Sequence, residues 1–203
     1  MSILSFDIGI FNLAYAHVTV GQPQTPDSAS NSTTNSHDKS LHTTIQDWGL
    51  LCLKSHDDPK KMDLNVLSRN LIALLYEKFS DVTYDTVLIE NQPCMKNPTM
   101  KSIQMVLYSY FVMQSYLEGK QVAIKFVSAS NKLKVTHKAD VSHITATAKY
   151  MQNKKYVVVY ARNYLDLTTT LNGKWIDVFE KEKKKDDLAD AYCQALHYIE
   201  NHL

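Results

Sequence analysis

The chain has 203 residues, of which 44% are hydrophobic and 21% are charged, with a formal net charge of +1. This composition is typical of one globular domain and excludes a disordered chain, and the overall charge by itself indicates no partner. The cysteines, Cys52, Cys94 and Cys193, are odd in number and lack zinc spacing, so we expect a reducing intracellular compartment. No apolar run is long enough to span a membrane, and we see no secretory or mitochondrial targeting signal.

The N-terminal part is predicted to be β-structure. Residues 2–8 and 12–20 are rich in apolar and β-branched residues with Gly9 between them, which predicts a hairpin. Residues 21–44 form a Ser/Thr/Asn/Pro tract with almost no core-forming residue, which we interpret as a flexible insertion between strands two and three. Residues 45–53 predict the third strand, so the first three strands form an antiparallel meander.

Helices and strands alternate after this meander. Apolar residues at helical spacing and short apolar runs predict helices at 62–79, 98–118, 153–166 and 187–201, and strands at 85–90 and 121–127. A meander followed by α/β crossovers predicts a single α/β domain over residues 1–203. We expect a mixed five-stranded sheet with parallel fourth and fifth strands and with helices on both faces. Strand one is central in this order, beside strand four.

Acidic residues lie at strand ends and at the start of the last predicted helix. Asp7 is inside an apolar strand, where burying an unpaired carboxylate is costly, and Gly9 follows it and leaves room for a close approach. Glu90 ends the fourth strand. Asp187 and Asp190 are three residues apart, so they share one face of a helix. In the predicted sheet these carboxylates converge at one edge.

Carboxylates that share a site require a compensating charge, and Mg²⁺ or Mn²⁺ prefers oxygen ligands. The four carboxylates together therefore favour a site for two divalent ions that hydrolyses a phosphodiester. Simpler alternatives stay open for single residues. Glu90 alone is compatible with a solvated strand end, and Asp186 and Asp187 with caps of the last helix.

Positive charge is concentrated in one segment of the chain. Residues 119–165 contain nine lysines and arginines and one acid, Asp140. A basic surface beside an acidic metal site suggests a polyanionic substrate whose backbone is bound by lysine, with a solvated lysine-rich face as the alternative. Neither GxxxxGK[ST] nor GxGxxG occurs, so we expect no nucleotide cofactor.

Three stretches of the sequence, FDIGIFNLAY, LIENQP and KKKDDLADAYCQAL, resemble the signatures of RuvC-type Holliday junction resolvases. The similarity covers nearly the whole chain outside residues 21–44 and is greatest to the branch of poxvirus, large-DNA-virus and fungal mitochondrial enzymes. It implies an RNase H-like fold, a homodimer and Mg²⁺-dependent cleavage of four-way branched DNA, with Mn²⁺ able to substitute. It also implies a role in recombination or in viral concatemer processing, in the cytoplasm or nucleus of an infected cell.

The resemblance implies a role for each matching acidic residue. Asp7, Glu90, Asp187 and Asp190 match the catalytic metal ligands, and Asp186 stays an alternative to Asp187 within the doublet. Lysines after the fifth strand and in the next helix match residues that contact DNA or act in catalysis. They are Lys132, Lys134, Lys154 and Lys155, with Lys134 taken as catalytic and Lys132 as its alternative.

Helix 98–118 matches the dimer helix of the family, which agrees with apolar residues that spread beyond one stripe. The predicted interface residues are Ile103, Val106, Leu107, Tyr110 and Phe111, and burial within one subunit is the alternative. Other functions stay open: a ribonuclease H acting on RNA–DNA hybrids, a junction-binding protein without catalysis, and an actin-like ATP-binding fold with a similar D-x-G turn.

Overall fold

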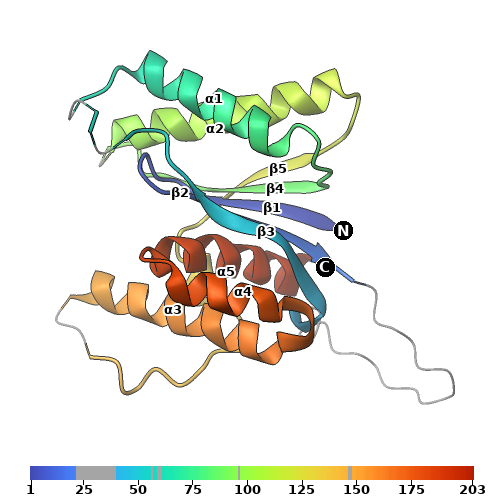
Figure 1. The fold of residues 1–203 in the computed structure, drawn as a ribbon, viewed down its shortest axis with the longest axis vertical. Helices are drawn as coiled ribbons and strands as arrows, with labels where there is room; N and C mark the ends of the chain where they lie inside the picture. The colour runs from blue at the N-terminus through green and yellow to red at the C-terminus, as the bar shows by residue number, and fades with distance from the viewer. Residues whose placement is uncertain (22–39, 56, 59–60, 96, 146–147) are drawn as a thin grey trace, which may run out of the picture.

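One mixed β-sheet forms the centre of the protein (Figure 1). The computed structural model describes residues 1–21, 40–55, 57–58, 61–95, 97–145 and 148–203. The strands are β1 (Ser2–Asp7), β2 (Leu13–Val20), β3 (Thr43–Leu51), β4 (Thr86–Glu90) and β5 (Ala123–Val127), in the spatial order β3-β2-β1-β4-β5. The first three strands are antiparallel, whereas β4 runs parallel to both β1 and β5. The predicted five-stranded sheet with a central β1 is confirmed.

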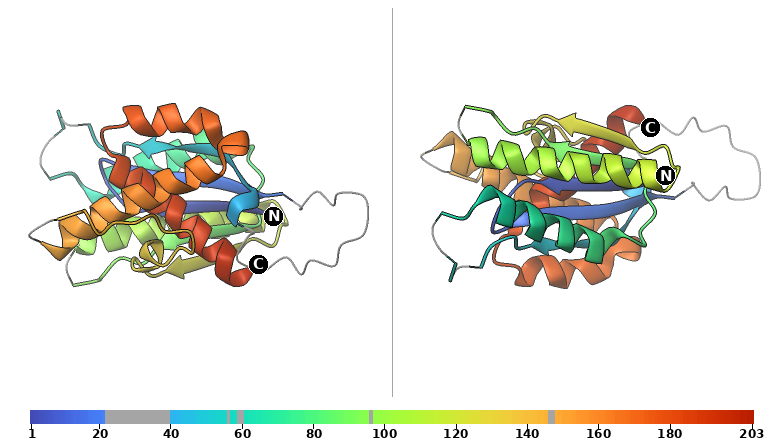
Figure 2. Two further views of the ribbon diagram at one scale, coloured as in Figure 1. Left: turned by 90° about the horizontal axis from the view of Figure 1, so that it is seen from below. Right: turned by 90° about the horizontal axis from the view of Figure 1, so that it is seen from above.

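Helices cover both faces of the sheet (Figures 1 and 2). On one face lie α1 (Leu64–Phe79) and α2 (Pro98–Leu117). On the other lie α3 (Lys149–Leu167), α4 (Thr169–Lys181) and α5 (Lys185–His202). A short 3-10 helix, η2 (Asn131–Leu133), follows β5. Within the described ranges, no helix combines the length and the hydrophobicity that crossing a membrane would require.

The central strand divides its side chains between two cores. Leu4 and Phe6 pack in the core under α1 and α2, where the Phe6 ring contacts Phe79 and Phe111 at centroid distances of 5.6 and 5.4 Å. Ile3 packs in the other core, under α5. Because side chains alternate along a strand, Asp7 lies on the same face as Ile3. The strand therefore presents its one acidic side chain towards α5.

Helix α4 was not predicted, and it changes the expected extent of the insertion. Asn172 of α4 accepts a hydrogen bond from the Ile45 N–H at 2.8 Å and donates one to the Thr43 carbonyl at 2.9 Å, so it satisfies the edge of β3. Ser40 and Thr43 are fully buried there. The predicted insertion at 21–44 is therefore wrong over 40–44, and its residues 22–39 lie outside the described part of the chain. Gly173 and the preceding threonines weaken the helical signal of α4.

The predicted interface on α2 is corrected by the packing. Ile103, Leu107 and Phe111 are fully buried in this chain's own core under α1 and α2, so they cannot contact a second copy, and Tyr110 of the same core is only 4% exposed. Val106 is partly buried against the same core. The apolar residues that α2 leaves exposed are different ones, Met105, Val112, Met113 and Tyr116. The helix is apolar on two sides, of which the sheet covers one.

Candidate active site

Two acidic residues meet at the carboxyl ends of parallel strands. The β1–β4 register pairs Phe6 with Ile89, so the next residues, Asp7 and Glu90, lie side by side. Leu88 faces the core under α5, and strand alternation places Glu90 on the same face. Both carboxylates are largely buried, with Asp7 14% and Glu90 11% exposed in their side chains. The sheet thus directs two carboxylates towards one helix.

Helix α5 supplies the third acid and is fixed to β1 by a buried amide. The Nε2 of Gln194 donates to the Ser5 hydroxyl at 2.9 Å and to the Phe6 carbonyl at 3.2 Å. Asp190 lies one turn before Gln194, on the same face of the helix, and is buried. The contact between α5 and β1 therefore places Asp190 beside Asp7.

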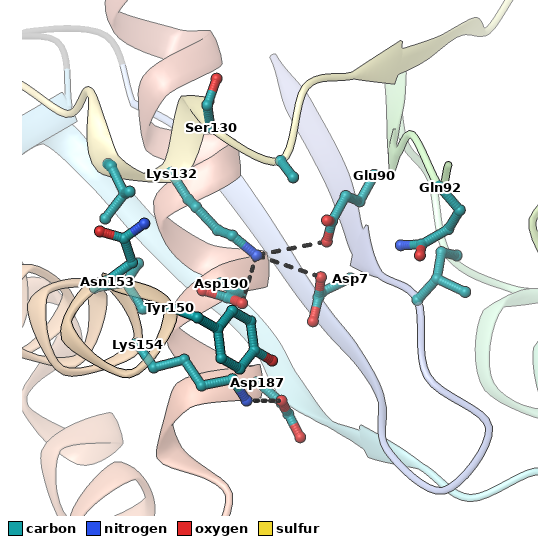
Figure 3. Close-up of a pocket in the computed structure, with 14 residues that line it drawn as sticks. Asp7, Glu90, Gln92, Ser130, Lys132, Tyr150, Asn153, Lys154, Asp187 and Asp190 are labelled. Atoms are coloured by element: carbon teal, nitrogen blue, oxygen red, sulfur yellow. Dashed lines mark hydrogen bonds and ion pairs between the residues drawn. The ribbon is translucent and has the colours of Figure 1, made fainter. Parts of the chain in front are cut away.

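Lys132 joins the three carboxylates into one cluster (Figure 3). From η2 its Nζ reaches to 2.5 Å from Asp190 Oδ2, 3.5 Å from Glu90 Oε2 and 3.7 Å from Asp7 Oδ1. Of the two lysines that the sequence left open, Lys132 is the one whose Nζ lies among the acids. Lys134 is exposed, and its Nζ lies 3.4 Å from Asn131. The 3-10 turn sends the two lysines in different directions, which the sequence spacing did not reveal.

The buried charges alter one another's proton affinity. Burial raises the pKa of Asp190 to about 6, with the ammonium of Lys132 opposing this rise and the carboxylate of Glu90 adding to it. Burial alone would lower the pKa of Lys132, but Asp190 and Glu90 outweigh it, so the pKa is raised. The lysine is therefore held in its charged form by the acids that surround it.

The acidic doublet at the start of α5 is divided between two positions. Lys154 of α3 forms an ion pair with Asp186 and lies 3.9 Å from Asp187. Burial opposes ionisation of Asp186, but the hydrogen bond from Lys154 prevails and lowers its pKa. For Asp187, burial and then the charge of Asp186 raise the pKa. Only Asp187 lines the same cleft as Asp7, whereas Asp186 lines a neighbouring hollow.

The cleft has a volume of about 470 Å³ and is open to solvent. Its walls include polar residues that the sequence did not single out: Gln92, Ser130, Tyr150 and Asn153. Tyr150 is exposed at the start of α3, and the Lys154 Nζ lies 5.4 Å from its ring centroid. Of the other predicted lysines, Lys155 is exposed and donates to the Thr145 carbonyl at 3.4 Å. Gln92 lies within the LIENQP stretch, whereas Ser130 lies in a loop and Tyr150 and Asn153 lie in the first two turns of α3, where no repeated pattern marks them.

The donors of this site suit a hard divalent cation, because all are carboxylate oxygens. In the described ranges, no group of three or more His, Cys, Asp or Glu side chains has the geometry of a finished metal site. Instead, the Lys132 ammonium lies at the point to which Asp7, Glu90 and Asp190 turn. The three carboxylates therefore have the chemistry of a cation site, and in this structure they surround the ammonium of Lys132.

The sheet order and the two helical layers (Figure 1) define an RNase H-like fold, and the acids on β1, β4 and the last helix converge on one cleft of it. Residues 3–103 match the family described as "Mitochondrial resolvase Ydc2 / RNA splicing MRS1". This match covers just under half of the chain, and together with the solved structures described below it supports a RuvC-type Holliday junction resolvase.

Solved structures share the fold over nearly the whole chain. The yeast mitochondrial Holliday junction resolvase Ydc2 is similar with a TM-score of 0.61 and 19% identity, covering 98% of this chain and 78% of that one. Thermus thermophilus RuvC in complex with a Holliday junction is similar with a TM-score of 0.57 and 15% identity, covering 98% of this chain and 94% of that one. The fowlpox virus resolvase in complex with Holliday junction DNA is similar with a TM-score of 0.54 and 17% identity, covering 98% of this chain and 97% of that one. These likenesses establish the fold.

A viral protein is more similar in sequence. The uncharacterized protein L451 of Acanthamoeba polyphaga mimivirus is 33% identical over 150 residues, which is 70% of this chain. The match covers 36% of that protein, so this chain spans about a third of the length of its relative.

Proposed function

We propose that the chain is a structure-selective endonuclease that resolves four-way DNA junctions by metal-dependent hydrolysis. The observation that carries this proposal is the meeting of Asp7, Glu90 and Asp190, from three separate elements, around one cation in an open cleft. The family match supports the substrate, since the RuvC and fowlpox virus structures contain Holliday junction DNA. The relative from mimivirus supports a role in infected cells.

In this proposal Mg²⁺, or Mn²⁺ in its place, is held by Asp7, Glu90 and Asp190, with Asp187 as a further ligand. Bound as a pair of ions, it would supply an activated water and stabilise the leaving oxygen. We favour Asp187 over Asp186 because Asp187 lines the cleft, whereas Asp186 is engaged by Lys154.

The lysines divide the remaining tasks in the proposal. Lys132 neutralises the buried acids, so we assign it the role in the site that was expected of Lys134. Lys154 lies between the cleft and the neighbouring hollow, and Lys155 is exposed close by. We propose that these two, together with the exposed Lys134, bind the phosphate backbone of the DNA.

A junction with two-fold symmetry requires two active sites, so we propose a homodimer. The surface that suits it combines the exposed apolar residues of α2 with those of α1: Ile72, Tyr76, Met105, Val112, Met113 and Tyr116. A shallow groove of about 310 Å³ runs between the two helices. An exposed apolar surface of this kind is typical of an interaction site.

The test is cleavage of a synthetic four-way junction whose strands are end-labelled in turn. We expect paired nicks at symmetric positions, giving ligatable duplexes, only when Mg²⁺ is present. Cleavage of an RNA–DNA hybrid or a flap without any cleavage of the junction would contradict the substrate while keeping the metal site.

A second candidate is an RNA-binding protein that does not cut. The family description favours it, because it names RNA splicing beside the resolvase. Tight binding of a structured RNA, with no metal-dependent cleavage of any branched DNA, would select this function.

A further inference from the structure

The Lys132 ammonium occupies the centre of the acidic cluster rather than its rim. Its Nζ lies within 4 Å of oxygens from Asp190, Glu90 and Asp7, and the side chain is 17% exposed. Each of these carboxylates comes from a different element, so their convergence is fixed by the fold. The ammonium is therefore the counter-ion of a site that the backbone has already assembled.

A divalent cation and this ammonium cannot share the same place. A divalent ion approaches carboxylate oxygens to about 2.0–2.6 Å, whereas the Lys132 Nζ is already 2.5 Å from Asp190 Oδ2. Two cations at such a separation repel each other strongly in a buried site. Binding of the ion thus requires the lysine to leave.

The open cleft beside Lys132 gives its side chain space into which it can move. It stands on the three-residue helix η2, and the cleft beside it has a volume of about 470 Å³ with Ser130 and Asn153 in its walls. Rotation of a long, unbranched side chain is enough to move its ammonium out of the carboxylates without moving the strands.

We propose that Lys132 is a built-in counter-ion that competes with the divalent cation for Asp7, Glu90 and Asp190. It stabilises the metal-free protein by neutralising part of the acidic cluster, and it sets the metal concentration at which the site fills. This inference rests on the proposed function, because it takes the divalent cation as the ligand of the site.

The first test measures Mn²⁺ binding without DNA, from the EPR signal of the free ion. Lys132→Met keeps the length of the side chain and removes its charge. We expect Mn²⁺ to bind this variant about tenfold more tightly or better, because no ammonium has to be displaced. Lys134→Met, at the exposed lysine outside the cluster, is the matched control and should bind Mn²⁺ like the wild type.

A second test uses the wild-type protein, so it does not depend on the folding of a variant. Reductive methylation of lysines, mapped by mass spectrometry, is compared with and without Mg²⁺. We expect modification of Lys132 to increase when Mg²⁺ is added, because its ammonium becomes accessible, while Lys134 stays unchanged.

Equal or weaker Mn²⁺ binding by Lys132→Met, or methylation of Lys132 that Mg²⁺ leaves unchanged, would overturn the competition. If junction cleavage still required metal, the proposed function would stand without it. Absence of Mn²⁺ binding by both proteins would instead overturn the metal-dependent function and this inference with it.

Discussion

The carboxylate of Asp7 is held by a strand whose four preceding residues are buried, so its position changes little with its charge. We expect Asp7→Asn to keep the fold and the binding of junctions but to lower the cleavage rate by about a hundredfold or more, because one metal ligand is lost. Gel shifts in EDTA and single-turnover cleavage in Mg²⁺ measure the two properties. Asp81→Asn, at an exposed acid, is the control, and wild-type cleavage by Asp7→Asn would refute the metal site.

Asp186 and Asp187 are adjacent in sequence but have different partners. Because Asp187 lines the cleft and Asp186 pairs with Lys154, we expect Asp187→Asn to lose far more activity than Asp186→Asn. The expected ratio of the two rates is about tenfold or more. Parallel cleavage assays at saturating Mg²⁺ decide this, and the opposite order would assign the ligand to Asp186.

At the scale of elements, the hydrogen bonds from Gln194 of α5 to Ser5 and Phe6 of β1, here called the Gln194 clamp, connect the stability of the fold with the geometry of the site. Gln194→Met leaves the buried Ser5 hydroxyl without its partner, so we expect a loss of about 1–3 kcal/mol in the free energy of unfolding. Adding Ser5→Ala removes the Ser5 hydroxyl that has lost its partner. We expect this second change to restore most of the stability, but not the cleavage rate. Urea unfolding and cleavage assays are the measurements. Recovery of both properties in the double variant would make the clamp purely structural.

The sequence revealed the elements best where their apolar pattern was strong. The apolar and β-branched runs of the strands and the helical spacing of 62–79 and 187–201 predicted most of the sheet and the acids that its edge brings together. Helix α4 was not predicted because an important part of its packing is polar: the side chain of Asn172 forms hydrogen bonds with the edge of β3. The direction of Lys132 and the covered side of α2 depend on packing between distant segments, which local patterns do not encode.

At the scale of the whole molecule, we expect the contribution of His17 to stability to be lost in mild acid. Burial lowers the pKa of His17, whose Nε2 lies 2.6 Å from the Ser2 hydroxyl, while Asp47 acts in the opposite direction. A histidine with a depressed pKa in the folded state favours the neutral form, so its stabilisation is present above the ordinary value of 6.5 and is lost as the pH falls below it.

The measurement is the free energy of unfolding at pH 7.5 and at pH 5, for the wild type and for His17→Gln. We expect the wild type to lose more stability than the variant over this interval, since glutamine does not take up a proton. Identical pH dependence in the two proteins would show that His17 does not contribute.

The three acids of the site are also synthesised at different times, because they lie far apart along the chain. A ribosome makes Asp7 first, Glu90 after α1, and Asp190 only after α2, β5, α3 and α4 have been synthesised. A nascent chain that has completed its sheet therefore carries two of the three converging carboxylates and lacks the Gln194 clamp. Under the proposed function, the chain therefore becomes able to cleave DNA only when α5 docks and brings Asp190 to the other two carboxylates.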